Sequence, residues 1–175
     1  MRGLRFGPSL ERPTLRPTEP LPLHHSWPLY DLREHLAPVV LDQEIAGNEA
    51  ALADRGLGLW HCNLADSSIS WTHGVYDIFG LEPGSIVPRL LSVSLYANDS
   101  REAMERLRAY AIRHQRGFTL DVDIHRPDGS DCAMRLIAAP VLLDGETVAL
   151  RGVKQWLPRD VGAPVRLEPT TFFIP

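Results

Sequence analysis

The chain has 175 residues, of which 44% are hydrophobic and 23% charged; this is the composition of a globular protein, and it excludes collagen-like or wholly disordered chains. A formal net charge of −4 and a pI near 5.9 argue against a dedicated nucleic-acid-binding protein, which is usually basic. No apolar run reaches the ~18 residues of a membrane span and the N-terminus lacks a secretory signal, so we expect a cytoplasmic protein with neither membrane nor nucleic acid as partner.

The prolines are concentrated at the two ends of the chain. Of the 15 prolines, seven lie in residues 1–40 and four in residues 158–175. Proline lacks an amide hydrogen and disfavours helical geometry in the residue before it. We therefore expect a proline-rich leader over 1–40, extended or partly helical, a folded domain over 41–157 and an irregular tail over 158–175. A domain of that length can bury a core without disulfides or metals.

The first element predicted in the domain is a flanking helix over residues 41–55. Leu41, Ile45 and Leu52 fall at helical spacing, and Gly56 stands where helices commonly end. The apolar stripe is thin, so it suits either an open edge of the domain or pairing with a second copy. We expect Leu41, Ile45 and Leu52 to lie at a homodimer interface.

A β-hairpin and short helices come next. Residues 59–64 and 68–71 have the composition of strands, and the polar residues 65–67 between them form a turn. Residues 75–79 predict a helical turn, and residues 85–97 predict short helices packed on the sheet.

One long helix and three strands complete the domain. The helix begins at Asp99, which forms a capping-box pattern with Glu102, and Gly117 ends it. Its apolar stripe contains Met104, Leu107, Ala111 and His114, and we assign Arg101, Arg106, Arg108, Arg113 and Arg116 to a charged outer face. Alternating apolar and polar residues or hairpin turns then predict strands over 118–125, 133–143 and 147–156.

Four stretches, in this order, resemble a PAS domain, and within that family the subgroup called PAS fold-3. They are GLWHCNL at 58–64, SW at 70–71 with YDIFGLEPG at 76–84, RPDG at 126–129 and GVKQ at 152–155. The resemblance implies an α+β fold with a five-stranded antiparallel sheet in the spatial order 2-1-5-4-3. Short helices and one long helix cover one face, and an N-terminal helix flanks the domain.

The last strand departs from the family pattern. The Asp-Ile-Thr that usually leads into an effector's signalling helix is replaced by Trp156-Leu157-Pro158. Pro158 prevents a helix from following directly, so we expect the output to pass to a separate protein.

Catalytic and metal-binding motifs are missing from the sequence. It has no GxSxG, phosphate-binding loop, HExxH or GxGxxG, so we expect no enzymatic activity, no catalytic residues and no metal site. Cys62 and Cys132 form no CxxC pair, and the resemblance places them too far apart for a disulfide, so we expect two free thiols.

A PAS fold implies a small cavity between the sheet and its short helices. Known PAS cofactors are flavin, haem and small organic acids. Residues 73–84 contain no cysteine, which disfavours flavin photochemistry. His114 is the one histidine placed to bind haem, and its position near a helix end favours carbonyl capping instead. The cofactor stays unassigned.

Six residues are our candidates for lining this cavity, with an ordinary core role as the alternative: Trp60, Cys62, Phe79, Met134, Leu136 and Lys154. Lys154 shares one face of the last strand with Leu150 and Gly152. If that face points into the cavity, the amine meets an anionic ligand. The alternative is an amine that reaches solvent past the end of the strand.

We interpret the chain as a non-catalytic PAS sensory or protein-interaction module of bacterial signal transduction. It would bind a small ligand and signal to a partner such as a histidine kinase or response regulator. The alternative is a regulatory fragment or subunit of a sensor histidine kinase or diguanylate cyclase system. Of the 18 basic residues only Lys154 is lysine, which we attribute to a GC-rich bacterial genome.

Overall fold

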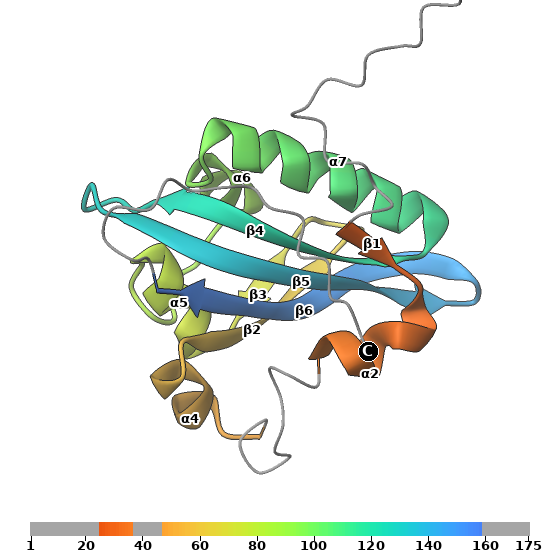
Figure 1. Ribbon diagram of the computed structural model, residues 1–175, viewed down its shortest axis with the longest axis horizontal. Helices are drawn as coiled ribbons and strands as arrows, with labels where there is room; N and C mark the ends of the chain where they lie inside the picture. The colour runs from red at the N-terminus through yellow and green to blue at the C-terminus, as the bar shows by residue number, and fades with distance from the viewer. Residues whose placement is uncertain (1–24, 37–46, 159–175) are drawn as a thin grey trace, which may run out of the picture.

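The computed structural model describes residues 25–36 and 47–158, which form an antiparallel sheet with helices on both faces (Figure 1). The strands are β1 (Ser26–Trp27), β2 (Leu57–Asn63), β3 (Ile69–Trp71), β4 (Gly117–His125), β5 (Asp131–Leu143) and β6 (Glu146–Leu157). Their spatial order is β1-β4-β5-β6-β2-β3. The last five strands have the predicted order 2-1-5-4-3, so the α+β fold is confirmed. The sheet has six strands rather than the predicted five, because β1 pairs with β4 at its edge.

The helices connect the strands as the sequence predicts, with fewer short helices than expected. They are the 3-10 helix η1 (Leu29–Asp31) and the α-helices α2 (Leu32–Leu36), α4 (Glu49–Asp54), α5 (His73–Phe79), α6 (Arg89–Ser94) and α7 (Asn98–His114). The 85–97 segment contains one helix, α6, rather than several. No helix in the described residues is long and apolar enough to cross a membrane.

The main core lies between the sheet and the helices α5, α6 and α7. Alternate residues of β4 point inward, and Leu120, Val122 and Ile124 are all at most 3% exposed. Met134 and Leu136 of β5 continue this layer. The same period-two pattern that predicted the strands therefore selects the face that the helices cover.

A second cluster covers the opposite face and explains the additional strand. Trp27 of β1 is 5% exposed and packs with Leu52, Ile137 and Val153. Its ring lies over Gly117, where a Cβ would fall 2.2 Å from the ring, so only glycine fits beneath it. The predicted leader therefore contributes Ser26 and Trp27 to the sheet.

The flanking helix is shorter than predicted where the structure describes it. Asn48 is its N-cap, with φ −113° and ψ 101°, and its side chain accepts a hydrogen bond from the Ala51 amide. The helix therefore starts at Glu49 rather than continuing through Asn48. Leu41 and Ile45 lie outside the described residues. We expected Leu52 at a homodimer interface. Its side chain is instead packed within its own protomer, where it is 1% exposed.

Both ends of α7 differ from the predicted caps. Ala97 is the N-cap and makes no side-chain cap hydrogen bond, and Asp99 lies one residue inside the helix. The acidic side chain still lies in the first turn, where it complements the helix dipole. Gln115, with φ 54°, provides the left-handed C-cap that we assigned to glycine.

Candidate functional site

The most unusual side chain of the core is the lone lysine. Lys154 lies on β6 opposite Leu136 of β5 and Gly58 of β2, and it is 5% exposed. Its strand face also holds Leu150, which is 1% exposed. The amine therefore points into the main core, and the alternative in which it reaches solvent past the strand end is wrong.

Aromatic rings surround the Lys154 amine. Its Nζ lies 4.5 Å from the ring centroid of Phe79, 5.4 Å from Trp71, 5.5 Å from Tyr96 and 5.7 Å from Trp60. Trp71 also stacks on Phe79, with ring centroids 4.7 Å apart. Ring faces attract a cation, so they offset part of the cost of placing a protonated amine in the core.

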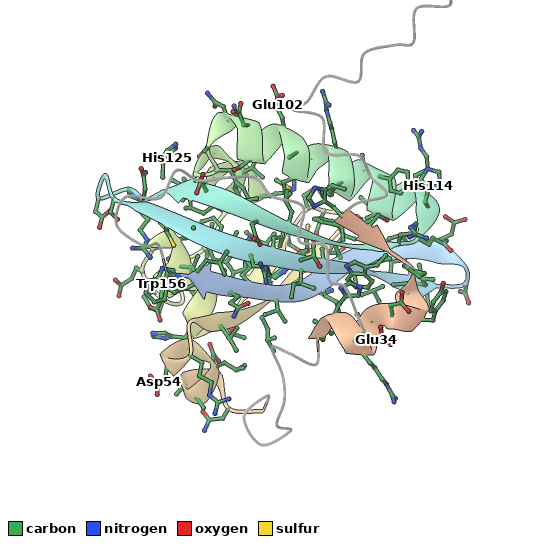
Figure 2. The ribbon with its side chains drawn as sticks, in the orientation of Figure 1. Glu34, Asp54, Glu102, His114, His125 and Trp156 are labelled. Atoms are coloured by element: carbon green, nitrogen blue, oxygen red, sulfur yellow. The ribbon has the colours of Figure 1, made fainter. Side chains whose placement is uncertain are left out.

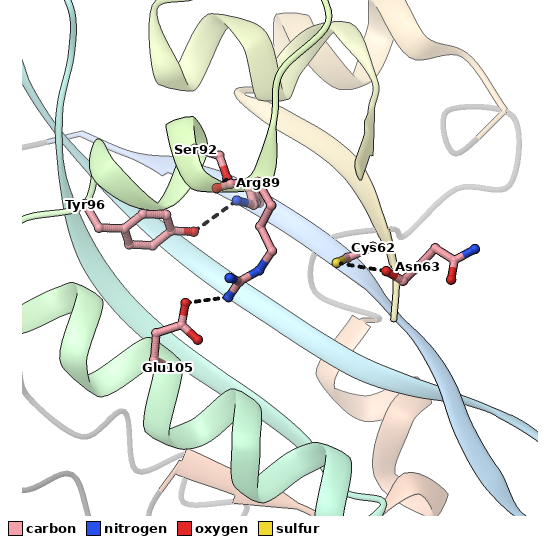
Figure 3. Close-up of polar contacts among 7 residues, drawn as sticks. Cys62, Asn63, Arg89, Ser92, Tyr96 and Glu105 are labelled. Carbon is pink, nitrogen blue, oxygen red and sulfur yellow. Dashed lines mark hydrogen bonds and ion pairs between the residues drawn. The ribbon is translucent and has the colours of Figure 1, made fainter. Parts of the chain in front are cut away.

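Tyr96 is the hydrogen-bond partner of the amine. Lys154 Nζ donates to Tyr96 Oη at 3.0 Å. In Figure 3 this bond is the dashed line that ends on the hydroxyl of the labelled Tyr96. The tyrosine is 4% exposed and lies between α6 and α7, where it pairs with Ile124 of β4 in an isolated bridge. The backbone beside it is fixed to β4, because the Ala97 amide donates to Asp123 and the His125 amide donates to Leu95.

Burial changes the acidity of both partners. It lowers the pKa of Lys154 from 10.5 to about 7, and the negative charge that Cys62 can carry opposes this shift. Burial likewise raises the pKa of Tyr96. Near neutral pH, the site therefore holds an amine that is about half neutral beside a hydroxyl that keeps its proton.

A small cavity of about 50 Å³ adjoins the amine. Of our six candidates, Trp60, Cys62 and Lys154 line it. Phe79 contacts the amine without lining the cavity. Met134 and Leu136 are packed in the core, 0% and 3% exposed.

Polar residues that sequence reasoning did not place here also line the cavity. They are Arg89 and Ser92 of α6, Tyr96, and Arg108 of α7. Arg89 forms an ion pair with Glu105 (Figure 3). Our assignment of Arg108 to the outer face of α7 is wrong. It follows Met104 by one helical turn, and this i, i+4 spacing from a buried residue could have revealed it.

The outer face of the sheet carries a larger groove. Its volume is about 400 Å³, and mostly apolar residues line it, including Leu36 of α2, Leu59 of β2, Ile137 of β5 and Val153 of β6. Trp60 and Trp71 line both this groove and the small cavity at Lys154, so the two hollows meet at these rings.

The remaining candidates for cofactor chemistry lie apart from one another. His114 is exposed near the end of α7 and packs on Tyr110, with ring centroids 4.3 Å apart (Figure 2). Cys62 and Cys132 are both buried and are not joined by a disulfide. Among the described residues, no three His, Cys, Asp or Glu side chains gather in a way that could hold a metal ion.

Solved structures match this arrangement at low sequence identity. A sensory box histidine kinase/response regulator from Burkholderia thailandensis E264 matches 71% of this chain and 84% of its own, with a TM-score of 0.53 and 14% identity. The N-terminal domain of a diguanylate cyclase with PAS/PAC sensor from Marinobacter aquaeolei matches 56% of this chain and 92% of its own, with a TM-score of 0.52 and 17% identity.

The fold is that of a PAS domain. A third match is an RNA-binding light-oxygen-voltage receptor, with a TM-score of 0.52 and 10% identity; it covers 59% of this chain but only 31% of the receptor. No protein-family model and no curated protein matches the sequence. The PAS assignment therefore rests on the sheet order, the helices on its inner face and these structural matches.

Proposed function

We propose that this PAS domain is a non-catalytic sensory module that binds a small ligand beside Lys154 and signals to a separate protein. The observation that carries the proposal is an ionisable amine, 5% exposed, that adjoins a small, partly open cavity in a fold used by sensors. A buried amine with a perturbed pKa in a cavity is a frequent mark of a functional site.

The size and charge of the cavity restrict the ligand. A volume of about 50 Å³ corresponds to a few water-sized groups and is far below the ~300 Å³ of a drug-sized pocket. Lys154, Arg89 and Arg108 line it, with Glu105 paired to Arg89. A small molecule that is anionic, or becomes anionic on binding, suits this lining.

The proposed partner is a signalling protein such as a histidine kinase or a response regulator. Support comes from the matched PAS sensors, which belong to a histidine kinase/response regulator and a diguanylate cyclase. The alternative is that the chain is a regulatory part of one such system. In this chain β6 ends at Leu157 and Pro158 follows, which disfavours helical geometry at Leu157 and departs from the direct strand-to-helix junction of the family pattern.

Ligand binding is tested by native mass spectrometry of the purified protein and of Lys154→Met. We expect a small adduct or an added small anion to be retained by the wild-type protein and lost in the variant. Leu143→Met, an exposed change of similar size on β5, is the control and retains it. Equal retention by all three proteins would contradict a site at Lys154.

Signalling is tested by affinity capture from the native host, followed by reconstitution with the captured protein. We expect a kinase, cyclase or response regulator whose activity changes when the wild-type domain is added and changes less with Lys154→Met. A captured enzyme whose activity is the same with and without the wild-type domain would contradict the proposal.

A further inference from the structure

We propose that Lys154 is a reversible carbon dioxide site, at which the buried amine forms a carbamate inside the cavity lined by Arg89 and Arg108. This inference names the ligand of the proposed sensory site and rests on that site. It follows from the position of the amine, the size of the cavity and the charges around it.

The cavity fits carbon dioxide better than larger electrophiles. Its volume of about 50 Å³ has room for roughly three to five water-sized groups, and carbon dioxide has three atoms. The walls near the amine are the rings of Trp60 and Trp71 together with Leu150 and Phe118. An apolar, uncharged molecule enters such a site without the desolvation cost that an ion would incur.

The proposed reaction balances without a further reactant. The Lys154 nitrogen lone pair attacks the carbon of carbon dioxide and forms a C–N bond. One C=O π pair moves onto oxygen, and the nitrogen releases one proton to solvent. The product is a carbamate with one negative charge, and the reverse reaction regenerates the amine and carbon dioxide.

The surroundings of the amine suit this negative charge. Tyr96 Oη lies 3.0 Å from Nζ, and burial raises the pKa of that hydroxyl, so it keeps a proton to donate to a carbamate oxygen. Arg89 is already paired with Glu105. Arg108 lines the same cavity and has no ion-pair partner within the described part of the chain, so its charge is available to the carbamate.

The amine must also be neutral to react. The groups that face it are Cys62 of β2, Arg89 and Ser92 of α6, Tyr96, and Arg108 of α7, with Glu105 behind Arg89. Burial lowers the pKa of Lys154 to about 7, so roughly half of the amine is neutral at that pH. An ordinary lysine, with a pKa near 10.4, is about one part in a few thousand neutral at the same pH.

The test uses the fact that Lys154 is the only lysine of the chain. The full chain is produced with ¹⁵N-labelled lysine and equilibrated with ¹³C-bicarbonate and carbon dioxide at about pH 8, one unit above the pKa of about 7. We expect a ¹³C signal with one-bond coupling to ¹⁵N, which disappears when carbon dioxide is removed. The α-amine of Met1 carries no ¹⁵N, so it cannot produce this coupling.

Variants test the role assigned to the arginine. Arg108→Gln should lower the carbamate population at a given carbon dioxide pressure by at least about tenfold, because a charge-assisted hydrogen bond is lost. Arg113→Gln, an exposed change on the same helix, should leave it unchanged. Absence of the coupled signal from folded wild-type protein at saturating carbon dioxide overturns the proposal. A shift of the ¹⁵N resonance without coupling also overturns it, and identifies a non-covalent anion site that leaves the proposed sensory function intact.

Discussion

At the scale of single residues, the candidate site depends on how the core tolerates Lys154. A charged amine transferred into an apolar interior is costly, and proteins usually respond by shifting the pKa of the group. Here four rings and the Tyr96 hydroxyl surround the amine, so its hydrogen-bonding and cation–π partners are provided within the core. Retaining such a group costs stability, which is expected where the group has a function.

The first prediction concerns the pH dependence of stability. Below pH 7 the amine is protonated in both the folded and unfolded states, and the full cost of burying the charge is present. Between pH 7 and 10.5 only the unfolded state binds the proton, so the free energy of unfolding rises with pH. We expect the wild-type protein to gain about 2 kcal/mol relative to Lys154→Met between pH 7 and 9, measured by urea denaturation. Parallel pH profiles for the two proteins would contradict this.

The second prediction concerns the hydroxyl of Tyr96. Tyr96→Phe preserves the ring near Lys154 and removes the oxygen that pairs with Nζ at 3.0 Å. We expect a loss of about 1–3 kcal/mol in the free energy of unfolding at neutral pH, because a buried polar group is left without its partner. Tyr30→Phe is the control, since Tyr30 is 86% exposed. Equal stabilities of the two variants would show that the bond contributes nothing.

At the scale of elements, β1 is the feature that most changes the predicted domain. The two-residue strand pairs with Gly117 and Phe118, and Trp27 Nε1 donates to Thr119 Oγ1 at 3.1 Å. The Trp27 ring also stacks on His35 of α2 at 4.2 Å. Trp27 is therefore the buried aromatic anchor of segment 25–36, which the hydrogen bonds from Arg116 to Ser26 also hold on the sheet.

The third prediction tests this attachment. Trp27→Ala should reduce the free energy of unfolding by about 3–5 kcal/mol, the usual cost of removing a buried tryptophan. Hydrogen exchange should also speed up at the amides of β4 around Phe118, which pairs with Ser26. Tyr30→Ala in the neighbouring 3-10 helix is the matched control and should leave both quantities near the wild-type values. Unchanged protection in Trp27→Ala would mean that β1 does not stabilise the sheet.

The sequence predicts those elements whose signals are local. The alternation around Leu120 and the turns at 127–129 and 144–145 identify the three long strands to within two residues at each end. The local signals do not show which distant parts of the chain pack on one another. Nothing local shows that Trp27 covers a glycine 90 positions away along the chain. The i, i+4 spacing from Met104 places Arg108 on the buried side of α7, but its meeting with Arg89 and Ser92 of α6 at one cavity is tertiary information.

In the candidate site, too, local patterns place some residues and only the tertiary structure places the others. Alternation alone put Lys154 on the face of Leu150, but the choice between core and solvent needed the position of β6 within the sheet. Tyr96 carries no motif, and it becomes the amine's partner because its backbone is fixed beside β4. Met134 and Leu136 are apolar, as cavity-lining residues usually are, but in the structure they are packed against other side chains of the main core.

At the scale of the whole molecule, the two faces of the sheet carry two hollows that share the rings of Trp60 and Trp71. The inner side holds the amine and its small cavity, and the outer side holds the apolar groove of about 400 Å³. Lys154 and Val153 are adjacent on β6 and face these opposite sides. A change at the proposed ligand site can therefore reach the outer groove through β6 and through the shared rings of Trp60 and Trp71.

The fourth prediction tests whether the homodimer expected from the sequence forms through the apolar groove on the outer face of the sheet. Leu59→Asp places a charge in the apolar groove, so we expect it to shift a wild-type dimer to monomer in sedimentation velocity. Val148→Asp changes an exposed residue of β6 outside the groove and should leave the dimer intact. A monomeric wild-type protein at micromolar concentration would contradict a dimer.

An NMR titration of the single lysine tests directly whether its amine is buried beside the cavity. Protein labelled with ¹³C only at lysine gives one Cε resonance, which belongs to Lys154 without further assignment. A buried amine at the cavity predicts a midpoint near pH 7, in line with a pKa of about 7. A midpoint near the ordinary lysine value of 10.5 would place the amine in solvent and contradict the site described here.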